Sequence, residues 1–115
     1  MQWAKTSHGS GGFDTYSGVA MAGGGSIIAV GDSGIASNTD WPNALITKYS
    51  PDGTLVWAKT FGGTGDDGFR TVALSGDGGI VAAGYNGSTD GDFPPSSGDW
   101  DTLVAIISQD GMLRL

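Results

Sequence analysis

Several residue types that carry common chemistry are missing or scarce in this chain of 115 residues. It has no cysteine, no glutamate, one histidine and five lysine or arginine residues. The lack of cysteine excludes disulfide staples and thiol chemistry. The net charge is −7, and its few basic residues are scattered. Binding to nucleic acid is therefore not expected, because phosphate contacts need clustered lysine or arginine. The net negative charge favours neutral or cationic partners.

Long apolar runs and helical patterns are also missing. No apolar stretch approaches the length that spans a membrane, so no membrane insertion is expected. No signal peptide is expected either, since Met1 and Gln2 lead directly into a predicted strand. No apolar stripe follows the helical period. All twelve acidic residues are aspartate, which favours turns, whereas glutamate favours helices. With 22 glycines at regular turn positions, the chain is predicted to be all-β.

What the sequence does contain is an internal repeat. The tetrapeptide Trp-Ala-Lys-Thr at residues 3–6 returns 54 residues later, and Val-Ala at residues 19–20 returns 53 residues later. Ser-Pro-Asp-Gly-Thr-Leu at residues 50–55 returns as Ser-Gln-Asp-Gly-Met-Leu 58 residues later. A period in the fifties points to a propeller or a solenoid. We therefore predict a single repeat domain over residues 1–115, with repeat one at about 4–57 and repeat two at about 58–115.

Each repeat is predicted to contain four short strands. The second and third strands of each repeat are nearly continuous apolar runs, so both of their faces are expected to be buried. Blades of a β-propeller meet this condition because each packs between two neighbours. Solenoid coils are typically shorter, roughly 20–29 residues in leucine-rich repeats. The predicted strands are Tyr16–Ala22, Ser26–Gly31, Ala44–Tyr49 and Thr54–Phe61, followed by Phe69–Ser75, Ile80–Tyr85, Thr102–Ser108 and a strand from Met112.

The phrases of repeat two identify a family resemblance. They are Gly-Gly-Thr-Gly-Asp-Asp at 62–67, Gly-Asp-Gly-Gly at 76–79, Ile-Val-Ala-Ala-Gly-Tyr at 80–85 and Gly-Asp-Trp-Asp at 98–101. Together they resemble bacterial and archaeal cell-surface β-propeller repeat proteins. The resemblance implies blades of four antiparallel strands, a structural or adhesive role, and an extracellular or cell-surface location. Repeat one departs from the pattern at residues 7–12 and 22–25.

The phase of the repeat predicts self-assembly. The chain opens in a fourth strand and stops just inside another, and two blades cannot close a ring that needs about 4–8. We expect the opening strand to pair with the third strand of a neighbouring chain, a head-to-tail contact that closes into a cyclic homo-oligomer. Three chains would give six blades and four would give eight, with the trimer slightly preferred. An alternative is that the chain is a fragment of a longer propeller. The assembly residues are Gln2, Trp3, Ala4, Lys5 and Thr6 on one side, and Leu103, Ala105 and Ile107 on the other.

Candidate ligand-binding residues fall in the longer loops, which strand alternation places at one end of the fold. Sugar binding would stack a pyranose on Trp41 or Trp100 while aspartates accept its hydroxyl groups; alternatively, both indoles fill seams between blades. Calcium would need several oxygen ligands, but the five-ligand loop spacing is missing. Asp66, Asp67 and Asp101 are then expected to bond to loop backbone instead. The full set of candidates is Asp40, Trp41, Asp66, Asp67, Asp90, Asp92, Phe93 and Trp100.

Enzymatic chemistry has little support in the sequence. His8 is the only histidine, and an acid–base pair made of aspartates would need strongly shifted pKa values. The segment 50–57 faintly resembles the Asp-box turn of sialidases and the tryptophan-docking segment of quinone-cofactor dehydrogenases. We expect no catalytic residue, metal or cofactor. The predicted function is a non-enzymatic propeller scaffold or interaction module; a glycan-binding propeller is the first alternative, and a quinoprotein-like or sialidase-like enzyme is the second.

Overall fold

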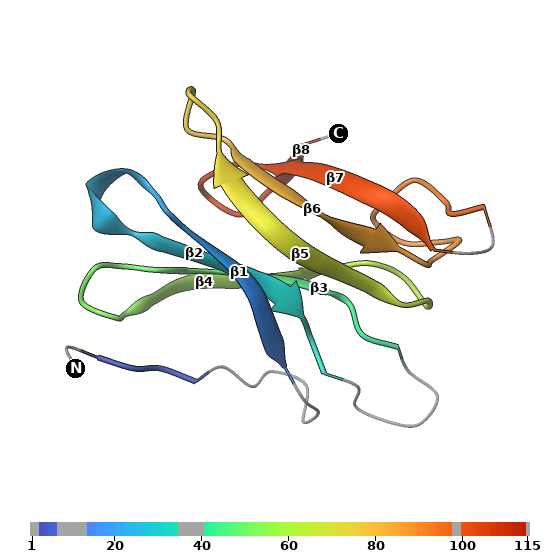
Figure 1. Ribbon diagram of the computed structural model, residues 1–115, viewed down its shortest axis with the longest axis horizontal. Coiled ribbons are helices and arrows are strands. Elements are labelled where there is room, and N and C mark those ends of the chain that lie inside the picture. The colour runs from blue at the N-terminus through green and yellow to red at the C-terminus, as the bar shows by residue number, and fades with distance from the viewer. Residues whose placement is uncertain (1–2, 7–13, 35–40, 98–99, 115) are drawn as a thin grey trace.

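A computed structural model describes residues 3–6, 14–34, 41–97 and 100–114. The chain is all-β, with two four-stranded antiparallel sheets in which the strands follow chain order (Figure 1). Within the described residues, no helix is long and apolar enough to cross a membrane. Sheet 1 contains β1 (Thr15–Met21), β2 (Ile27–Asp32), β3 (Ala44–Tyr49) and β4 (Leu55–Phe61). Sheet 2 contains β5 (Asp67–Leu74), β6 (Ile80–Asn86), β7 (Asp101–Ile107) and β8 (Leu113–Arg114).

The tight turns lie where the sequence predicts them, and a local aspartate stabilises three of the four; the β1–β2 turn at 22–26 is glycine-rich instead. In the β3–β4 turn, the Gly53 amide donates to the Ser50 carbonyl at 3.0 Å, and the Thr54 amide donates to Asp52 Oδ1 at 3.1 Å. Gly53 has a φ of +88°, a conformation that glycine adopts at little cost. A hydrogen bond from the Ser50 hydroxyl, together with the Thr54 amide, lowers the pKa of Asp52. Equivalent Ser-x-Asp-Gly turns at 75–78 and 108–111 close the β5–β6 and β7–β8 hairpins.

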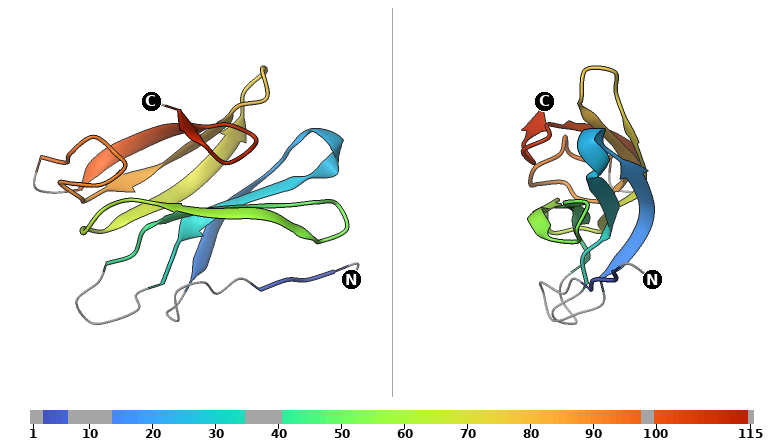
Figure 2. Two further views of the ribbon diagram at one scale, coloured as in Figure 1. Left: turned by 180° about the vertical axis from the view of Figure 1, so that it is seen from behind. Right: turned by 90° about the vertical axis from the view of Figure 1, so that its left-hand side faces the viewer.

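The apolar core lies between the two sheets, which stack face to face with a twist (Figures 1 and 2). Both contribute the inward-facing side chains of their central strands, and burying them against each other is the main stabilising contribution to this pair of layers. The buried core residues of sheet 1 include Ile28, Val30, Ala44 and Ile46, and those of sheet 2 include Phe69, Ile80, Ala82, Leu103, Ala105 and Ile107.

The outer faces of the third strands differ between the repeats. Burial of both faces is observed for β3, whose residues Ala44–Thr47 are all buried. Within the single chain β7 is buried on one face only: Leu103, Ala105 and Ile107 face the core, whereas Val104 and Ile106 are 70% and 46% exposed. The physical reason is that no described part of the chain packs on the outer side of sheet 2.

The segment at residues 3–6 forms no strand within the chain. It runs beside sheet 1 on the side away from sheet 2 (Figure 1). The Trp3 indole N–H donates to the Pro51 carbonyl at 2.9 Å, and the ring lies 6.0 Å from that of Tyr49. The segment is therefore anchored to sheet 1 through its tryptophan. Gln2 lies outside the described residues.

Candidate functional site

The β2–β3 loop (33–43), the β4–β5 loop (62–66) and the β6–β7 loop (87–100) lie at one end of the two sheets, as strand alternation predicts (Figure 1). The first and last are long, as expected, but the β4–β5 loop has five residues, the same length as the turns at the opposite end. The β6–β7 loop is fastened to the β4–β5 loop by carboxylates. Asp90 Oδ1 accepts from the Thr64 amide at 2.8 Å, and Asp92 Oδ2 accepts from the Gly62 amide at 3.0 Å. These two candidate ligand residues hold the loops in place, and the Thr64 amide and hydroxyl lower the pKa of Asp90.

Asp67 is a structural anchor of this end. Its side chain is fully buried, and it accepts from the Ser88 hydroxyl at 2.6 Å, the Gly63 amide at 3.1 Å and the Gly87 amide at 3.2 Å. Its own amide donates to the Pro42 carbonyl at 2.9 Å, which ties the β2–β3 loop to the same point. Asp67 thus satisfies loop donors, one of the two roles that the sequence suggested for it.

Phe93 belongs to the core rather than to an open binding surface. It is only 4% exposed; its ring packs edge-on against Phe69 at 6.2 Å and in a tilted arrangement against Phe61 at 6.3 Å. The β6–β7 loop folds back so that this aromatic covers the end of the core. Its selection as a ligand residue rested on its position in a long loop, where burial is not apparent from the sequence.

A polar cluster that the sequence did not single out connects the two sheets. The Tyr85 hydroxyl on β6 donates to Asp32 Oδ2 on β2 at 3.1 Å and to Asp66 Oδ1 at 3.3 Å. The Arg70 guanidinium lies 5.1 Å from the centre of the Tyr85 ring. Burial raises the pKa of both Asp32 and Asp66, an effect that the Tyr85 hydrogen bond and the Arg70 charge oppose. Burial likewise raises the pKa of Tyr85.

The repeat offered a signal for this cluster. Asp32 and Tyr85 are 53 residues apart, so they hold the same position of the repeat, directly after a glycine. A position that is aspartate in one copy and tyrosine in the other presents an acceptor and a donor. In the folded chain these two groups meet across the sheets.

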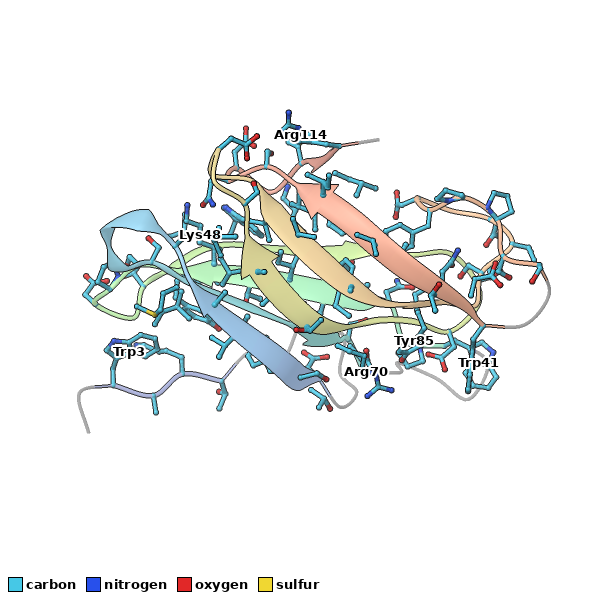
Figure 3. All side chains as sticks on the ribbon, turned by 45° about the horizontal axis from the view of Figure 1, so that its top comes forward. Trp3, Trp41, Lys48, Arg70, Tyr85 and Arg114 are labelled. Atoms are coloured by element: carbon cyan, nitrogen blue, oxygen red, sulfur yellow. The ribbon has the colours of Figure 1, made fainter. Side chains whose placement is uncertain are left out.

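The two tryptophans of the long loops are exposed. Trp41 is 58% and Trp100 is 68% exposed, so neither fills a seam within this chain. The Trp100 ring packs at 5.9 Å from that of Tyr85. Figure 3 shows Trp41, Tyr85 and Arg70 at the same end of the molecule. Asp40 lies outside the described residues.

The arrangement offers stacking surfaces and hydrogen-bonding groups. Among the described residues, no group of three or more histidine, cysteine, aspartate or glutamate side chains is placed to hold a metal ion. The Asp-box-like segment is a turn plus packing, because the Trp57 indole donates to the Gln109 carbonyl at 2.9 Å. No protein-family model matches the chain, and no curated protein matches it either.

Proposed function

We propose that this chain is a non-enzymatic β-propeller scaffold or interaction module, in which the two sheets are blades of a ring built from several copies. The observation that carries the proposal is a pair of equivalent residues. Val104 on β7 stands 58 residues after Ile46 on β3, at the same position of the repeat. Ile46 is fully buried because sheet 2 packs on it, whereas Val104 is 70% exposed. A following blade would bury Val104 in the same way.

The opposite end of the stack presents the complementary face. Val19 and Met21 on β1 are exposed, and they lie 53 residues before Val72 and Leu74 of β5. Val72 and Leu74 are partly buried and pack against the core between the sheets. Sheet 1 of a second copy therefore fits on sheet 2 of the first, in the way that sheet 2 fits on sheet 1 within a chain. This contact is heterologous, and it generates a ring when the rotation closes. Three copies give six blades and four give eight, with the trimer slightly preferred.

One pair of positions distinguishes the contact between copies from the contact within a chain. Within the chain, Lys48 Nζ donates to Gln109 Oε1 at 3.0 Å across the two sheets. The equivalents at the contact between copies are Ile106 and Pro51, which are both apolar. If sheet 1 of one copy packed on sheet 1 of another, the Lys48 amine would face Pro51 and would lose the Gln109 Oε1 acceptor. A polar pair within each chain and an apolar pair between chains favour an assembly in which sheet 2 of one copy packs on sheet 1 of the next.

Val104→Arg is expected to dissociate the assembly into folded single chains. Arginine at this position places a charge on the face that a second copy would cover, and its removal from water costs free energy. The measurement is the solution mass, by light scattering after size exclusion, with circular dichroism to confirm folding. The unsubstituted chain is expected at three or four times the chain mass.

Val56→Arg is the matched control. Val56 is an exposed strand valine, and its equivalent 58 residues later is Arg114, so the repeat tolerates arginine there. This variant is expected to keep the mass of the unsubstituted assembly. A folded single chain at high concentration, without any substitution, would contradict the proposal.

Glycan binding at the long-loop end is the second candidate, favoured by the exposure of both indoles beside the Tyr85 cluster. An indole stacks on the apolar face of a sugar ring, and the neighbouring carboxylates accept hydroxyl hydrogen bonds. If this holds, a glycan array gives a hit whose affinity falls at least tenfold in Trp41→Ala or Trp100→Ala. Val56→Arg, which lies beside the β3–β4 turn at the opposite end of the strands and is expected to keep the assembly, is the control. An array without hits would contradict glycan binding and would leave the scaffold or interaction module as the one proposed function.

A further inference from the structure

Trp3 docks on sheet 1 in the way that Trp57 docks on sheet 2. The Trp3 indole donates to the Pro51 carbonyl at 2.9 Å, and the Trp57 indole donates to the Gln109 carbonyl at 2.9 Å. Pro51 and Gln109 are equivalent residues of the repeat, as are the two tryptophans. Each ring also lies over the turn glycine that follows: a Cβ on Gly53 would come within 2.8 Å of the Trp3 ring, and one on Gly111 within 3.2 Å of the Trp57 ring.

Trp57, however, is part of a paired strand, whereas Trp3 is not. Trp57 docks on sheet 2 but belongs to sheet 1, where its strand β4 pairs with β3. Residues 3–6 run in the equivalent place beside sheet 1 but have no strand partner among the described residues. The sheet that would supply this partner is the one that precedes sheet 1 in a ring.

Among the residues that the structure describes, the outer edge of β7 is open where such a segment would pair. Within the described residues, β8 pairs only with Ile106 and Ile107, which leaves residues 101–105 of β7 without a partner on that side. In sheet 1 the corresponding stretch of β3 is covered by β4 along its full length. An open strand edge presents unpaired N–H and C=O groups that another extended segment can satisfy.

We infer that residues 4–6 of one copy add to the open edge of β7 in a second copy, which is the partner, and complete its outer strand together with β8. This inference rests on the proposed ring and specifies how its copies are joined. The β3–β4 register gives the pairs, since Thr47 lies opposite Ala58, Ile46 opposite Lys59 and Leu45 opposite Thr60. Transferred by the repeat, these become Ala105 opposite Ala4, Val104 opposite Lys5 and Leu103 opposite Thr6.

The docked tryptophan favours this addition. Because Trp3 is already fixed on sheet 1, the segment that follows it is held in a place from which a second copy can accept it. Ordering a segment before association lowers the entropy cost of binding. Association then forms two contacts at once. The exposed apolar face of sheet 2 in the second copy packs on sheet 1 of the first, and residues 4–6 of the first copy pair with the open edge of β7 in the second.

Cysteine crosslinking tests the register, and the absence of native cysteine makes the readout clean. Lys5→Cys with Val104→Cys, and separately Ala4→Cys with Ala105→Cys, place the two thiols opposite each other in different copies. Neighbouring pairs alternate between hydrogen-bonded and non-hydrogen-bonded geometry, so the two variants cover both. After mild oxidation, at least one of them is expected to give a disulfide-linked ladder up to the mass of the ring on non-reducing gels. Lys5→Cys with Ile106→Cys is shifted by two residues, beyond the usual span of a disulfide, and is expected to stay uncrosslinked.

The outcomes separate this inference from the proposal on which it rests. If light scattering gives a ring but neither in-register pair crosslinks, strand addition is wrong and the face contact stands. Equal crosslinking of the shifted control would likewise overturn the register. If the chain is a folded monomer, the ring itself is wrong. A chain that lacks residues 1–6 is expected to lose the ring mass while it keeps its β-sheet circular dichroism; an unchanged mass would contradict strand addition.

Discussion

Replacing Phe69 by alanine is expected to lower the free energy of unfolding by about 3–5 kcal/mol. The side chain is fully buried between the sheets, and Phe93 packs edge-on against it at 6.2 Å. Its loss leaves a cavity and also removes the surface on which the β6–β7 loop rests. A domain of this size is typically stable by about 5–15 kcal/mol, so the change takes a large share of the total. Urea unfolding followed by tryptophan fluorescence measures the effect.

Tyr16→Ala is the matched comparison for this prediction. Tyr16 lies 53 residues before Phe69, at the same position of the repeat, but it is on the face of sheet 1 that points away from sheet 2 and is 40% exposed. Its hydroxyl lies within hydrogen-bonding distance of Thr47 Oγ1, at 2.9 Å. We expect a loss of only about 1–2 kcal/mol from partial burial and this bond. Both substitutions are best measured in the Val104→Arg background, where no second copy covers Tyr16. Equal losses would contradict the assignment of the core to the seam between the sheets.

The secondary structure of this protein could be predicted closely because its turns carry their own chemistry. The predicted bounds of β3 are the observed ones, Ala44–Tyr49, and its neighbours differ by one or two residues at their ends. Aspartate and glycine at fixed places follow β3, β5 and β7. In the turns after β3 and β5 the aspartate accepts from the turn backbone, and in all three turns the glycine takes the positive φ. These interactions span only a few residues, and the sequence displays them directly.

Burial of the strand faces depends on neighbours that the local sequence does not show. The apolar runs of β3 and β7 are alike, and the same expectation follows from each. In the folded chain both faces of β3 are covered, one of them by sheet 2, while β7 has one open face. Periodicity indicates which residues avoid water, but the partner that covers them is decided by the packing of whole sheets.

The candidate site was predicted in part, for a related reason. The sequence places Asp90, Asp92 and Phe93 in a long loop, where either ligand contact or internal bonding is possible. The outcome depends on how this loop folds onto residues 62–66, a contact between segments far apart in sequence. The Asp32–Tyr85 bond is of the same kind, because it joins the two repeats. Only the exposed indoles of Trp41 and Trp100 remain open to solvent among the aromatic candidates.

Asp67 illustrates how an acidic loop residue can be essential without meeting a ligand. Asp67→Ala is expected to destabilise the fold by about 3–5 kcal/mol, since it leaves three donors without an acceptor and each buried unsatisfied group costs about 1–3 kcal/mol. Those donors are the Ser88 hydroxyl and the amides of Gly63 and Gly87. Urea unfolding gives the magnitude, and hydrogen exchange of the two amides locates it.

The control is Asp92→Ala in the same pair of loops. Asp92 is exposed, and its carboxylate accepts from the Gly62 amide at 3.0 Å. Water replaces that bond when the carboxylate is removed, so we expect a loss of only about 0.5–1 kcal/mol. Faster exchange at Gly63 and Gly87 is expected in Asp67→Ala and not in Asp92→Ala. A fold that tolerates Asp67→Ala as well as Asp92→Ala would mean that the buried carboxylate is not what holds these loops together, and Asp67 would return to the ligand candidates. The contrast thus separates an anchor of the long-loop end from an exposed loop contact.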